Sequence, residues 1–573
     1  MTRDWVVHPK NDTAHALASE LKIHPAIVEI ILRRGIAPSE IFNFLNPSLA
    51  ALQDPFVFQD MAKAVERIRT AISKKEKILV YGDYDVDGVT ASAILYPILK
   101  KLGAEVEVYI PQRLGEGYGL NQPALEKLLK KKFSLVITAD NGITGIEPIK
   151  FLKEKGVDTL VVDHHIPKNT LPPAVAIVSA VIGEKGDPHL AACGLAFKLA
   201  WALLGNLESV KEYLDLVAVG TVADLAPVIG ENRILLRHGL AALANTKRKG
   251  LRALMAAAGI SPKNVGTRDI AFGLGPRINA SGRMGSPENA FKLLVTDNEL
   301  EAQNLAQILE DGNRDRQRVE AAAFEEAVER VELEGLHETE KIFVLDNPDW
   351  HQGVLGIVAA RLVERYQRPS IVLSVKNGVA KGSGRSTSFY SIFDNVLKCE
   401  ELLESFGGHA QACGLTIKEE NIAIFRKKLN EAFQEEKDSC RLARELAVES
   451  ELALSDLDMK FLQDLERLSP FGPGNKKPLF LSRALRVKGL PKKRGKDTLQ
   501  CWVSDALGKT TCELIGFRMY GRWRERPEAQ ALDIVYQPAL NYFNGIASIE
   551  LQLEDWRASS LPAGQAGYAS VLS

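Results

Sequence analysis

The chain has 573 residues, of which 46% are hydrophobic and 25% are charged, and its formal net charge is −1 at pH 7. This composition is that of an ordinary soluble globular protein, and the length predicts about three or four domains. The near-neutral charge argues against a surface that is uniformly coated by nucleic acid, but it leaves a local basic groove open.

Cysteine use and the amino terminus bear on the compartment. The six cysteines form no Cys-x-x-Cys pair and no even spacing, so we predict neither a zinc ribbon nor a disulfide scaffold and expect a reducing cytoplasm. No signal-peptide-like apolar segment follows Met1, and nowhere do eighteen apolar residues run together. We therefore expect a cytoplasmic protein that is neither exported nor membrane-spanning.

Residues 1–55 are expected to form an amino-terminal helical segment, because helical patterns occur over 14–21 and 25–34. This segment contains no recognisable chemistry. Over 56–295, strand-like runs alternate with helical ones, which predicts a parallel sheet with helices on both faces. The expected strands are 77–81, 105–110, 134–139 and 157–162, and the expected helices begin near residues 90, 122 and 146.

Acidic residues follow these apolar runs. The run over 77–81 leads directly into the sequence GDYDVDG, and later runs also end in an aspartate. Because parallel strands end at one edge of the sheet, where open α/β folds keep their ligand sites, we expect these side chains to converge. They are Asp83, Asp85 and Asp87, then Asp140, then Asp163 with His164 and His165, and finally Asp224.

The sequence GDYDVDG has two other possible interpretations, a calcium-binding loop and a solvated turn. A calcium-binding helix–loop–helix could begin at Asp83, but its loop needs a glutamate at the twelfth position, where this chain has Ile94. A strand is also predicted where that motif needs a helix. The second alternative is a solvated turn, because Asp and Gly are common turn residues. Recurrence of the same pattern along the chain favours a site.

The middle of the chain is predicted to connect two domains. Residues 276–287 are rich in glycine and basic residues, which favours a connecting loop over a phosphate contact. Over 296–335 there is no proline and apolar residues recur, which predicts one long helix. The charged run over 313–318 is interpreted as the solvated face of this helix.

A second α/β domain is expected over 336–440. Two segments of small residues, 381–386 and 406–414, are interpreted as loops. Their glycines would let backbone amides approach a phosphate, and the Arg385 guanidinium could bind one through two hydrogen bonds. The other expected elements are strands at 342–345 and 370–375 and a helix at 354–366.

Short strands and turns predict a small OB-like β-barrel over 441–556, followed by a tail over 557–573. Basic and aromatic residues alternate over 517–524, and 492–496 is a basic turn. Rings beside cations suit single-stranded nucleic acid, whereas a solvated hairpin with core aromatic residues is the alternative. The expected strands are 498–504, 511–517, 533–536 and 546–553, with a hairpin turn at 544–545. The candidate strand-binding residues are Lys493, Arg518, Tyr520, Arg522 and Trp523.

Several strings together resemble the DHH phosphoesterase superfamily, namely GDYDVDG, ADNG, DHH and GTVAD, and GGH at 407–409 resembles the signature of its associated second domain. The strings LGPRINASGRMG, NRDRQ, WHQGV and PFGPGN are similar to those of the RecJ family of single-strand-specific exonucleases. The likeness extends over about 50–555. Two departures are Ser179-Ala180, where relatives often have Asn-Pro, and Cys413, where an alanine is usual. Neither removes a metal ligand.

The resemblance implies a site for two divalent cations, Mn²⁺ or Mg²⁺, with Asp140 bridging them. Carboxylates with a single imidazole independently suit these ions better than zinc. His165 is implied to contact the scissile phosphate, and Asp83 to be an outer or weak ligand. The implied ligands are Asp85 and Asp140 for one ion and Asp87, Asp140, His164 and Asp224 for the other.

The resemblance further implies an exonuclease that releases mononucleotides from the 5′ end of single-stranded DNA, in DNA repair and recombination. A single-strand-binding protein and a helicase are the partners implied by the same analogy, and a monomer is expected. Arg113, Ser383 and Arg385 are expected to hold the terminal 5′-phosphate. The residues expected to contact the strand near the site are Arg277, Asn279, Arg283 and His409.

Two alternatives stay open at this point. A hydrolase of short oligonucleotides or cyclic dinucleotides would share the metals and the second domain, but so small a substrate needs neither the long helix nor the barrel. A catalytically silent strand-binding relative is disfavoured, because every matched ligand from Asp85 to Asp224 is retained.

Overall fold

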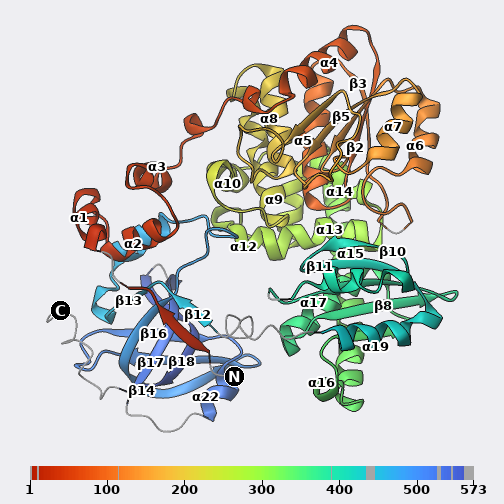
Figure 1. Cartoon of the computed structure of the whole chain (residues 1–573). Coiled ribbons are helices and arrows are strands. Elements are labelled where there is room, and N and C mark those ends of the chain that lie inside the picture. Colours follow the sequence, from red (N-terminus) through yellow and green to blue (C-terminus); the bar gives the residue numbers. More distant parts are fainter. Residues whose placement is uncertain are drawn as a thin grey trace. The chain divides into compact units, whose positions relative to one another are not determined.

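The computed structural model describes residues 3–9, 12–113, 115–388, 390–433, 445–525, 531–543 and 546–560 (Figure 1). The chain forms two compact units. One is continuous, Leu49–Ala443, and the other combines Met1–Ser48 with Arg444–Ser573. Within the described ranges, no helix has both the length and the apolar character needed to cross a membrane.

The first domain of the continuous unit is built on a parallel sheet, as predicted, but the sheet has five strands where four were expected. Alternate side chains of the central strand β2 (Lys77–Gly82) enter two different cores, with Val80 in one and Leu79 in the other. Because both faces of the sheet are apolar, helices cover both. The strand order is β3 (Glu105–Tyr109), β2, β4 (Leu135–Ala139), β5 (Asp158–Asp163) and β6 (Ala176–Ser179). One core takes in α5 (Val86–Lys101) and α8 (Ala192–Leu204), and the other takes in α6 (Gln122–Leu128) and α7 (Ile146–Glu154) (Figure 1).

The sequence GDYDVDG spans the end of β2 and the first turn of α5. Asp85 is the N-cap residue, and its Oδ1 accepts a hydrogen bond from the Gly88 N–H at 3.1 Å. The helix therefore begins at Val86, earlier than the expected residue 90. A Cβ added at Gly88 would lie 2.5 Å from the Asp83 nitrogen, so only glycine allows this tight turn.

Residues 276–287 are largely helical, so the expectation of a loop was wrong. Helix α13 spans Gly275–Met284 and continues the π-helical turn η7 (Ile270–Leu274). Pro276 lies in the first turn of α13, where a missing N–H is tolerated. Glycine here serves packing, since a Cβ at Gly282 would lie 3.0 Å from the Tyr84 carbonyl oxygen. The helix thus packs closely against the loop that carries the first three aspartates.

Helix α15 (Glu299–Leu333) confirms the predicted long helix, with 35 residues. The solvated interpretation of its charged run was wrong for two residues. Asn313 is buried, and the Arg316 side chain is only 12% exposed. Arg316 is fixed within the helix by Glu320, to which Nη1 donates a hydrogen bond at 2.6 Å.

The second domain of this unit has a mixed five-stranded sheet, and the two segments expected as loops belong to it. Residues 381–385 lie in β9 (Val379–Arg385), and 406–414 form the hairpin of β10 (Leu403–His409) and β11 (Ala412–Lys418). The small residues are needed for packing, since a Cβ at Gly382 would lie 2.3 Å from the Leu373 side chain. The strand order is β10, β11, β9, β8 (Ser370–Lys376) and β7 (Phe343–Asn347), with helices α17 (Leu355–Tyr366) and α19 (Ile422–Ala432).

The other unit contains a closed five-stranded barrel, which confirms the OB-like fold. The pairing runs β14, β15, β16, β18, β17 and returns to β14 (Phe480–Arg494), a strand that sequence patterns did not indicate. The predicted turn at 544–545 lies outside the described residues. The remaining elements are β15 (Thr498–Ser504), β16 (Thr511–Gly516), α22 (Tyr520–Arg524), β17 (Leu532–Phe543) and β18 (Ile546–Ala558).

The amino-terminal segment folds with the barrel. Strand β1 (Asp4–Val7) pairs in parallel with β12 (Glu445–Val448). Helices α1 (Asp12–Leu21) and α2 (Pro25–Arg33), both predicted, share one hydrophobic core with α21 (Met459–Glu466) and the barrel. The first 48 residues are therefore part of the barrel's unit.

Candidate metal centre and phosphate site

The acidic residues meet at the carboxyl edge of the first sheet, as predicted. They follow the ends of β2, β4 and β5, and Asp224 follows the end of α9 (Leu214–Ala223). In each of three overlapping groups, the potential ligand atoms lie within 4.8 Å of one another. The groups are Asp83, Asp85 and Asp140; Asp87, His164 and Asp224; and Asp140, His164 and His165.

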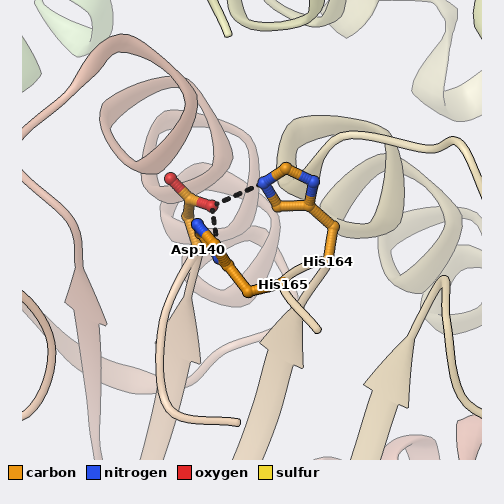
Figure 2. Close-up of side chains that lie close together, drawn as sticks. All are labelled: Asp140, His164 and His165. Atoms are coloured by element: carbon orange, nitrogen blue, oxygen red, sulfur yellow. Dashed lines mark ion pairs between the residues drawn. The ribbon is translucent and has the colours of Figure 1, made fainter. Parts of the chain in front are cut away.

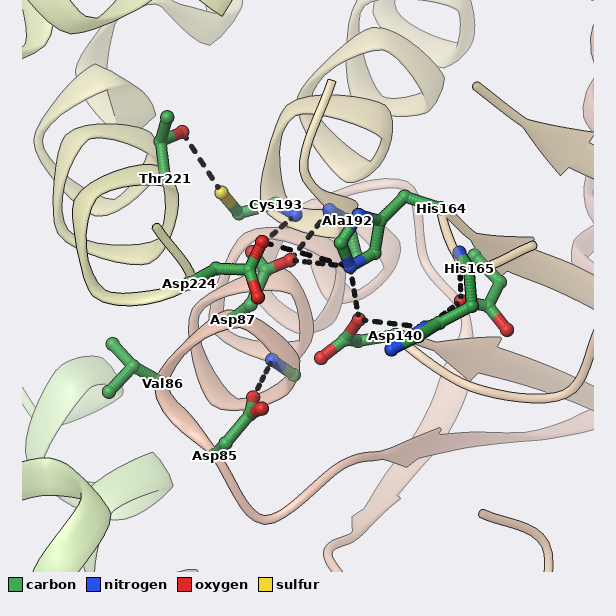
Figure 3. Close-up of polar contacts among 12 residues, drawn as sticks. Asp85, Val86, Asp87, Asp140, His164, His165, Ala192, Cys193, Thr221 and Asp224 are labelled. Carbon is green, nitrogen blue, oxygen red and sulfur yellow. Dashed lines mark hydrogen bonds and ion pairs between the residues drawn. The ribbon is translucent and has the colours of Figure 1, made fainter. Parts of the chain in front are cut away.

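Asp87 is held at the amino terminus of a helix. Its two carboxylate oxygens accept hydrogen bonds from the backbone N–H groups of Ala192 at 2.7 Å and Cys193 at 2.9 Å, where α8 begins (Figure 3). Burial raises the pKa of Asp87 above its usual value, although the nearby His164 and these donors oppose the shift. Its carboxylate orientation is therefore fixed by the backbone rather than by a flexible side chain.

Asp140 has a left-handed backbone conformation, with φ at 67°, and is fully enclosed. This conformation turns its side chain toward both histidines (Figure 2). Its Oδ1 lies 3.3 Å from His164 Nε2 and 3.8 Å from His165 Nδ1. Asp140 belongs to two of the three ligand groups and links Asp83 and Asp85 to the histidines, while His164 links Asp140 to Asp87 and Asp224.

Three buried atoms of the site have no hydrogen-bond partner among the described residues, namely Asp83 Oδ1, Asp140 Oδ1 and His164 Nε2. Buried polar atoms normally have partners. Burial, and next the charges of neighbouring aspartates, hold the pKa values of Asp83 and Asp140 well above the usual range and raise the pKa of Asp224 to about 8. A bound cation would offset the repulsion among these aspartate charges. The oxygen-rich donor set fits Mn²⁺ or Mg²⁺.

His165 is oriented by two neighbours. Its Nδ1 lies 2.7 Å from Asp163 Oδ1 and 3.1 Å from the Tyr118 hydroxyl. Burial lowers the pKa of His165, but the hydrogen bond and charge of Asp163 outweigh it and raise the pKa to about 9. Asp163 also accepts a hydrogen bond from the Ile143 N–H at 3.0 Å, which fixes the carboxylate. Tyr118 was not predicted, although it lies in the same glycine-rich string as Arg113.

Three arginines form a second cluster, the arginine cluster, which consists of Arg113, Arg283 and Arg385. Burial, and next the charge of Arg113, lower the pKa of Arg283 to about 10. Burial is also the main cause that lowers the pKa of Arg385, and Arg113 adds to it. Within the described residues, none of the three forms an ion pair with a carboxylate. Partly buried cations without acidic partners among the described residues favour a phosphate ligand.

The arginine cluster is held by both domains of the continuous unit. Arg283 Nη1 donates to the Gly353 carbonyl at 2.9 Å, and Arg385 Nη1 donates to Ser383 Oγ at 3.0 Å. The Arg113 guanidinium lies over the Tyr84 ring, 5.2 Å from its centroid. Of the predicted terminal-phosphate residues, Arg113 therefore lies beside the GDYDVDG loop, and Ser383 lies beside Arg385.

The other residues predicted to contact the strand lie outside the arginine cluster, except Arg283. Arg277 Nε donates to Glu310 at 2.5 Å, so its guanidinium ties α13 to α15. Asn279 and Arg283 line a pocket of about 170 Å³. His409 ends β10 and is exposed, opposite Ala412, which also pairs with Arg385 in the sheet. Sequence patterns missed Arg316 and Ile357 in the lining, which is formed by Ala223, Ala271, Gly275, Pro276, Asn279, Arg283, Arg316 and Ile357.

The barrel corrects one prediction. Trp523 is 3% exposed and packs against Trp556 at 5.1 Å between centroids, so its ring belongs to the core and the stacking prediction for it was wrong. Arg522 donates to Asp555 at 2.7 Å. Lys493 is exposed, and the exposed ring on β15 is Trp502. The prediction failed because basic and aromatic residues that alternate in sequence can belong to a short helix, such as α22, as well as to an exposed strand.

Three family models match this chain. They are the DHH family N-terminal domain over residues 77–221, the DHHA1 domain over 339–435 and the RecJ OB domain over 448–555. Their order is that of the two domains and the barrel described above.

Similar proteins cover nearly the whole chain. The single-stranded-DNA-specific exonuclease RecJ of Bacillus subtilis is 35% identical over 557 residues, which cover 96% of this chain and 70% of the relative. The exonuclease RecJ of Haemophilus influenzae is 30% identical, and the match covers 94% of this chain and 97% of the relative. The crystal structure of RecJ in complex with Mn²⁺ from Thermus thermophilus is 30% identical, with a TM-score of 0.82 over 98% of this chain and 80% of that chain. The crystal structure of the Mg²⁺ complex from the same organism is 28% identical in sequence and has a TM-score of 0.73.

Proposed function

Because this chain belongs to the RecJ family of single-stranded-DNA-specific exonucleases, we propose that it hydrolyses single-stranded DNA from the 5′ end and releases 5′-mononucleotides. The observation that carries the proposal is the pairing of two clusters. Buried carboxylates with unpartnered oxygens lie beside the arginine cluster, which has no acidic partners among the described residues. A cation site next to a phosphate site suits phosphodiester hydrolysis.

Two divalent cations, Mn²⁺ or Mg²⁺, would bind the clustered ligands, and they supply charge stabilisation and activation of water when bound. Asp85 and Asp140 would hold one, with Asp83 beside them. The other would be held by Asp87, Asp140, His164 and Asp224. Fixed hydrogen bonds to Asp85 and Asp87 keep these carboxylates in position before substrate arrives.

The remaining side chains orient the strand. His165, held by Asp163 and Tyr118, is proposed to contact the scissile phosphate through its other ring nitrogen. The terminal 5′-phosphate is proposed to bind to Arg113, Ser383 and Arg385. The doubly charged terminal phosphate should bind the guanidinium groups more strongly than a singly charged internal phosphodiester does. Cleavage from the 5′ end follows if this pocket accepts only a terminus.

The proposal also covers strand binding by the barrel, the cellular role and the partners. Exposed cations and Trp502 on the barrel would hold the rest of the strand. A role in DNA repair and recombination, in the cytoplasm, with a helicase or a single-strand-binding protein as partner, suits an enzyme that needs free strands.

A substrate panel tests the proposal. We expect the long 5′-phosphorylated single strand to be digested in Mn²⁺, the duplex to resist, and a chelator to stop cleavage. Hydrolysis of a dinucleotide or a cyclic dinucleotide in preference to the long strand would favour the alternative hydrolase. Binding of strands without cleavage in either ion would favour a catalytically silent relative.

A further inference from the structure

One face of the continuous helical run from η7 through α13 carries an unexplained aromatic residue. Phe272, Pro276, Asn279 and Arg283 follow one another at spacings of four, three and four residues, so they lie on one face. Three of the four line the pocket of about 170 Å³. Phe272 extends the same stripe by one turn, and it is 78% exposed.

The pocket already has the chemistry to bind a phosphate. It begins at Ala223, next to the proposed ligand Asp224, and extends to Ile357 in the second domain. Arg283 and Arg316 are among its lining residues, and Arg316 Nη1 also pairs with Glu320 at 2.6 Å. The buried Arg316 Nε has no hydrogen-bond partner among the described residues, while its Nη2 donates to Asn313 at 2.9 Å and keeps the group in place.

The turn that carries Phe272 is packed on one side. A Cβ at Gly273 would lie 2.5 Å from the Ile260 side chain, so that side of the turn is packed. A π-helical turn is uncommon and often marks a functional site. Leu225, directly after Asp224, is 65% exposed and has φ at 61°, a conformation that a leucine rarely adopts. Single exposed apolar residues are ordinary, but these two flank Ala223 and Ala271 of one cationic pocket.

We propose that Phe272 stacks on a nucleobase of the strand that leaves the metal centre, while Arg283 and Arg316 bind a backbone phosphate of the same strand. This inference rests on the proposed function and adds to it a residue that selects for unpaired bases. An exposed phenyl ring on the same helical face as the pocket-lining Arg283 matches what a nucleic-acid strand offers, flat apolar bases and a charged backbone. A base within a duplex is covered on both faces and would not reach the ring.

The test combines a protein change with a substrate change. Phe272→Ala, Phe272→Tyr and the wild type are compared on a single strand and on strands with one abasic residue at successive positions from the second nucleotide onward. Phe56→Ala is the matched control, because Phe56 is also exposed, at 52%, and lies in the same unit. Thermal melting verifies that each variant is folded.

On the intact strand we expect Phe272→Ala to lower kcat/KM by a factor between about 5 and 100, mainly through KM. Phe272→Tyr and Phe56→Ala should stay close to wild type. When the missing base is the one that stacks on Phe272, kcat/KM of the wild type should fall by the same factor. The kcat/KM of Phe272→Ala should not fall further on that abasic strand. Unchanged kcat/KM for Phe272→Ala on the intact strand, or equal further losses at every abasic position, would overturn the inference. Absence of cleavage by the wild type would instead refute the proposed function.

Discussion

Asp140 combines a rare backbone conformation with a central place among the ligands. Asn and Asp tolerate the left-handed region best, so Asp140→Asn keeps the backbone and the shape of the side chain while removing its charge. Since Asp140 is shared by two ligand groups, we predict that cleavage in Mn²⁺ falls at least about a hundredfold while the fold is retained.

Steady-state cleavage and thermal melting measure this effect. Asp158→Asn is the matched control, because Asp158 begins β5 at the opposite edge of the same sheet and pairs with Arg67. It should cleave at close to the wild-type rate. Activity of Asp140→Asn within about tenfold of wild type at saturating Mn²⁺ would contradict the bridging role.

Arg385 is predicted to recognise the terminal phosphate. Arg385→Ala should reduce the preference for a 5′-phosphate over a 5′-hydroxyl strand by about tenfold, the value of a charge-assisted hydrogen bond. Arg385→Lys should recover only part of it, because lysine lacks the two-pronged guanidinium. The ratio of kcat/KM on the two strands is the readout. Arg426→Ala, in the same domain but paired with Asp346, should leave the ratio unchanged, and an equal loss on both strands would place Arg385 elsewhere.

Among the elements, α8 depends on a buried ion pair. Lys198 Nζ lies 2.7 Å from Glu231 Oε1 and donates to the Gln53 carbonyl at 2.6 Å, with both side chains almost fully buried. Burial lowers the pKa of Lys198 and raises that of Glu231, so each charge depends on the other. We predict that Lys198→Met lowers the free energy of unfolding by about 3–5 kcal/mol.

Denaturant unfolding measures this loss, and the exposed pair of Lys211 with Glu208 provides the control. Lys211→Ala should change stability by no more than about 1 kcal/mol. The double variant Lys198→Met with Glu231→Gln should recover part of the loss, because it leaves no unpaired buried charge. A Lys198→Met variant as stable as wild type would show that the pair does not stabilise α8.

Elements that end in acidic residues could be predicted from the sequence, whereas glycine-rich elements could not. At Asp140 and Asp163 an apolar run followed by Asp marked a buried strand and its end, whereas the similar run before Asp224 is the helix α9. In 276–287 the same glycines that suggested a loop allow α13 to pack on Tyr84. Gly382 likewise accommodates Leu373 in a sheet. Such packing is decided by partners distant in sequence, which local composition does not show.

The same limit applies to the site. Ligands that follow strand ends were predictable, but the pocket with Arg316 and Ile357 is formed by helices of different domains. Nor did composition separate Trp523, in the core, from Trp502, on the surface.

For the molecule as a whole, we propose that the continuous unit cuts the strand and that the barrel holds it. On the barrel, Lys492 and Lys493 are exposed and have no acidic partner among the described residues. We predict that changing both to alanine flattens the log–log salt dependence of long-strand binding by about 0.7 for each phosphate that is no longer neutralised. Short-strand cleavage should be unaffected. Lys211→Ala is the control, and an unaltered slope for the double variant would remove the barrel from strand binding.

The central claim is a metal-dependent exonuclease that starts at the 5′ end. The most direct measurement is a time course on one long 5′-phosphorylated single strand that carries different labels on its two terminal nucleotides, with Mn²⁺, with chelator, and with the Asp140→Asn variant. The account predicts that the 5′-terminal label appears first, as a 5′-mononucleotide, and that it appears only with the wild type and Mn²⁺. Release of the 3′-terminal label first, or release of the 5′ label at an unchanged rate in chelator, would contradict it.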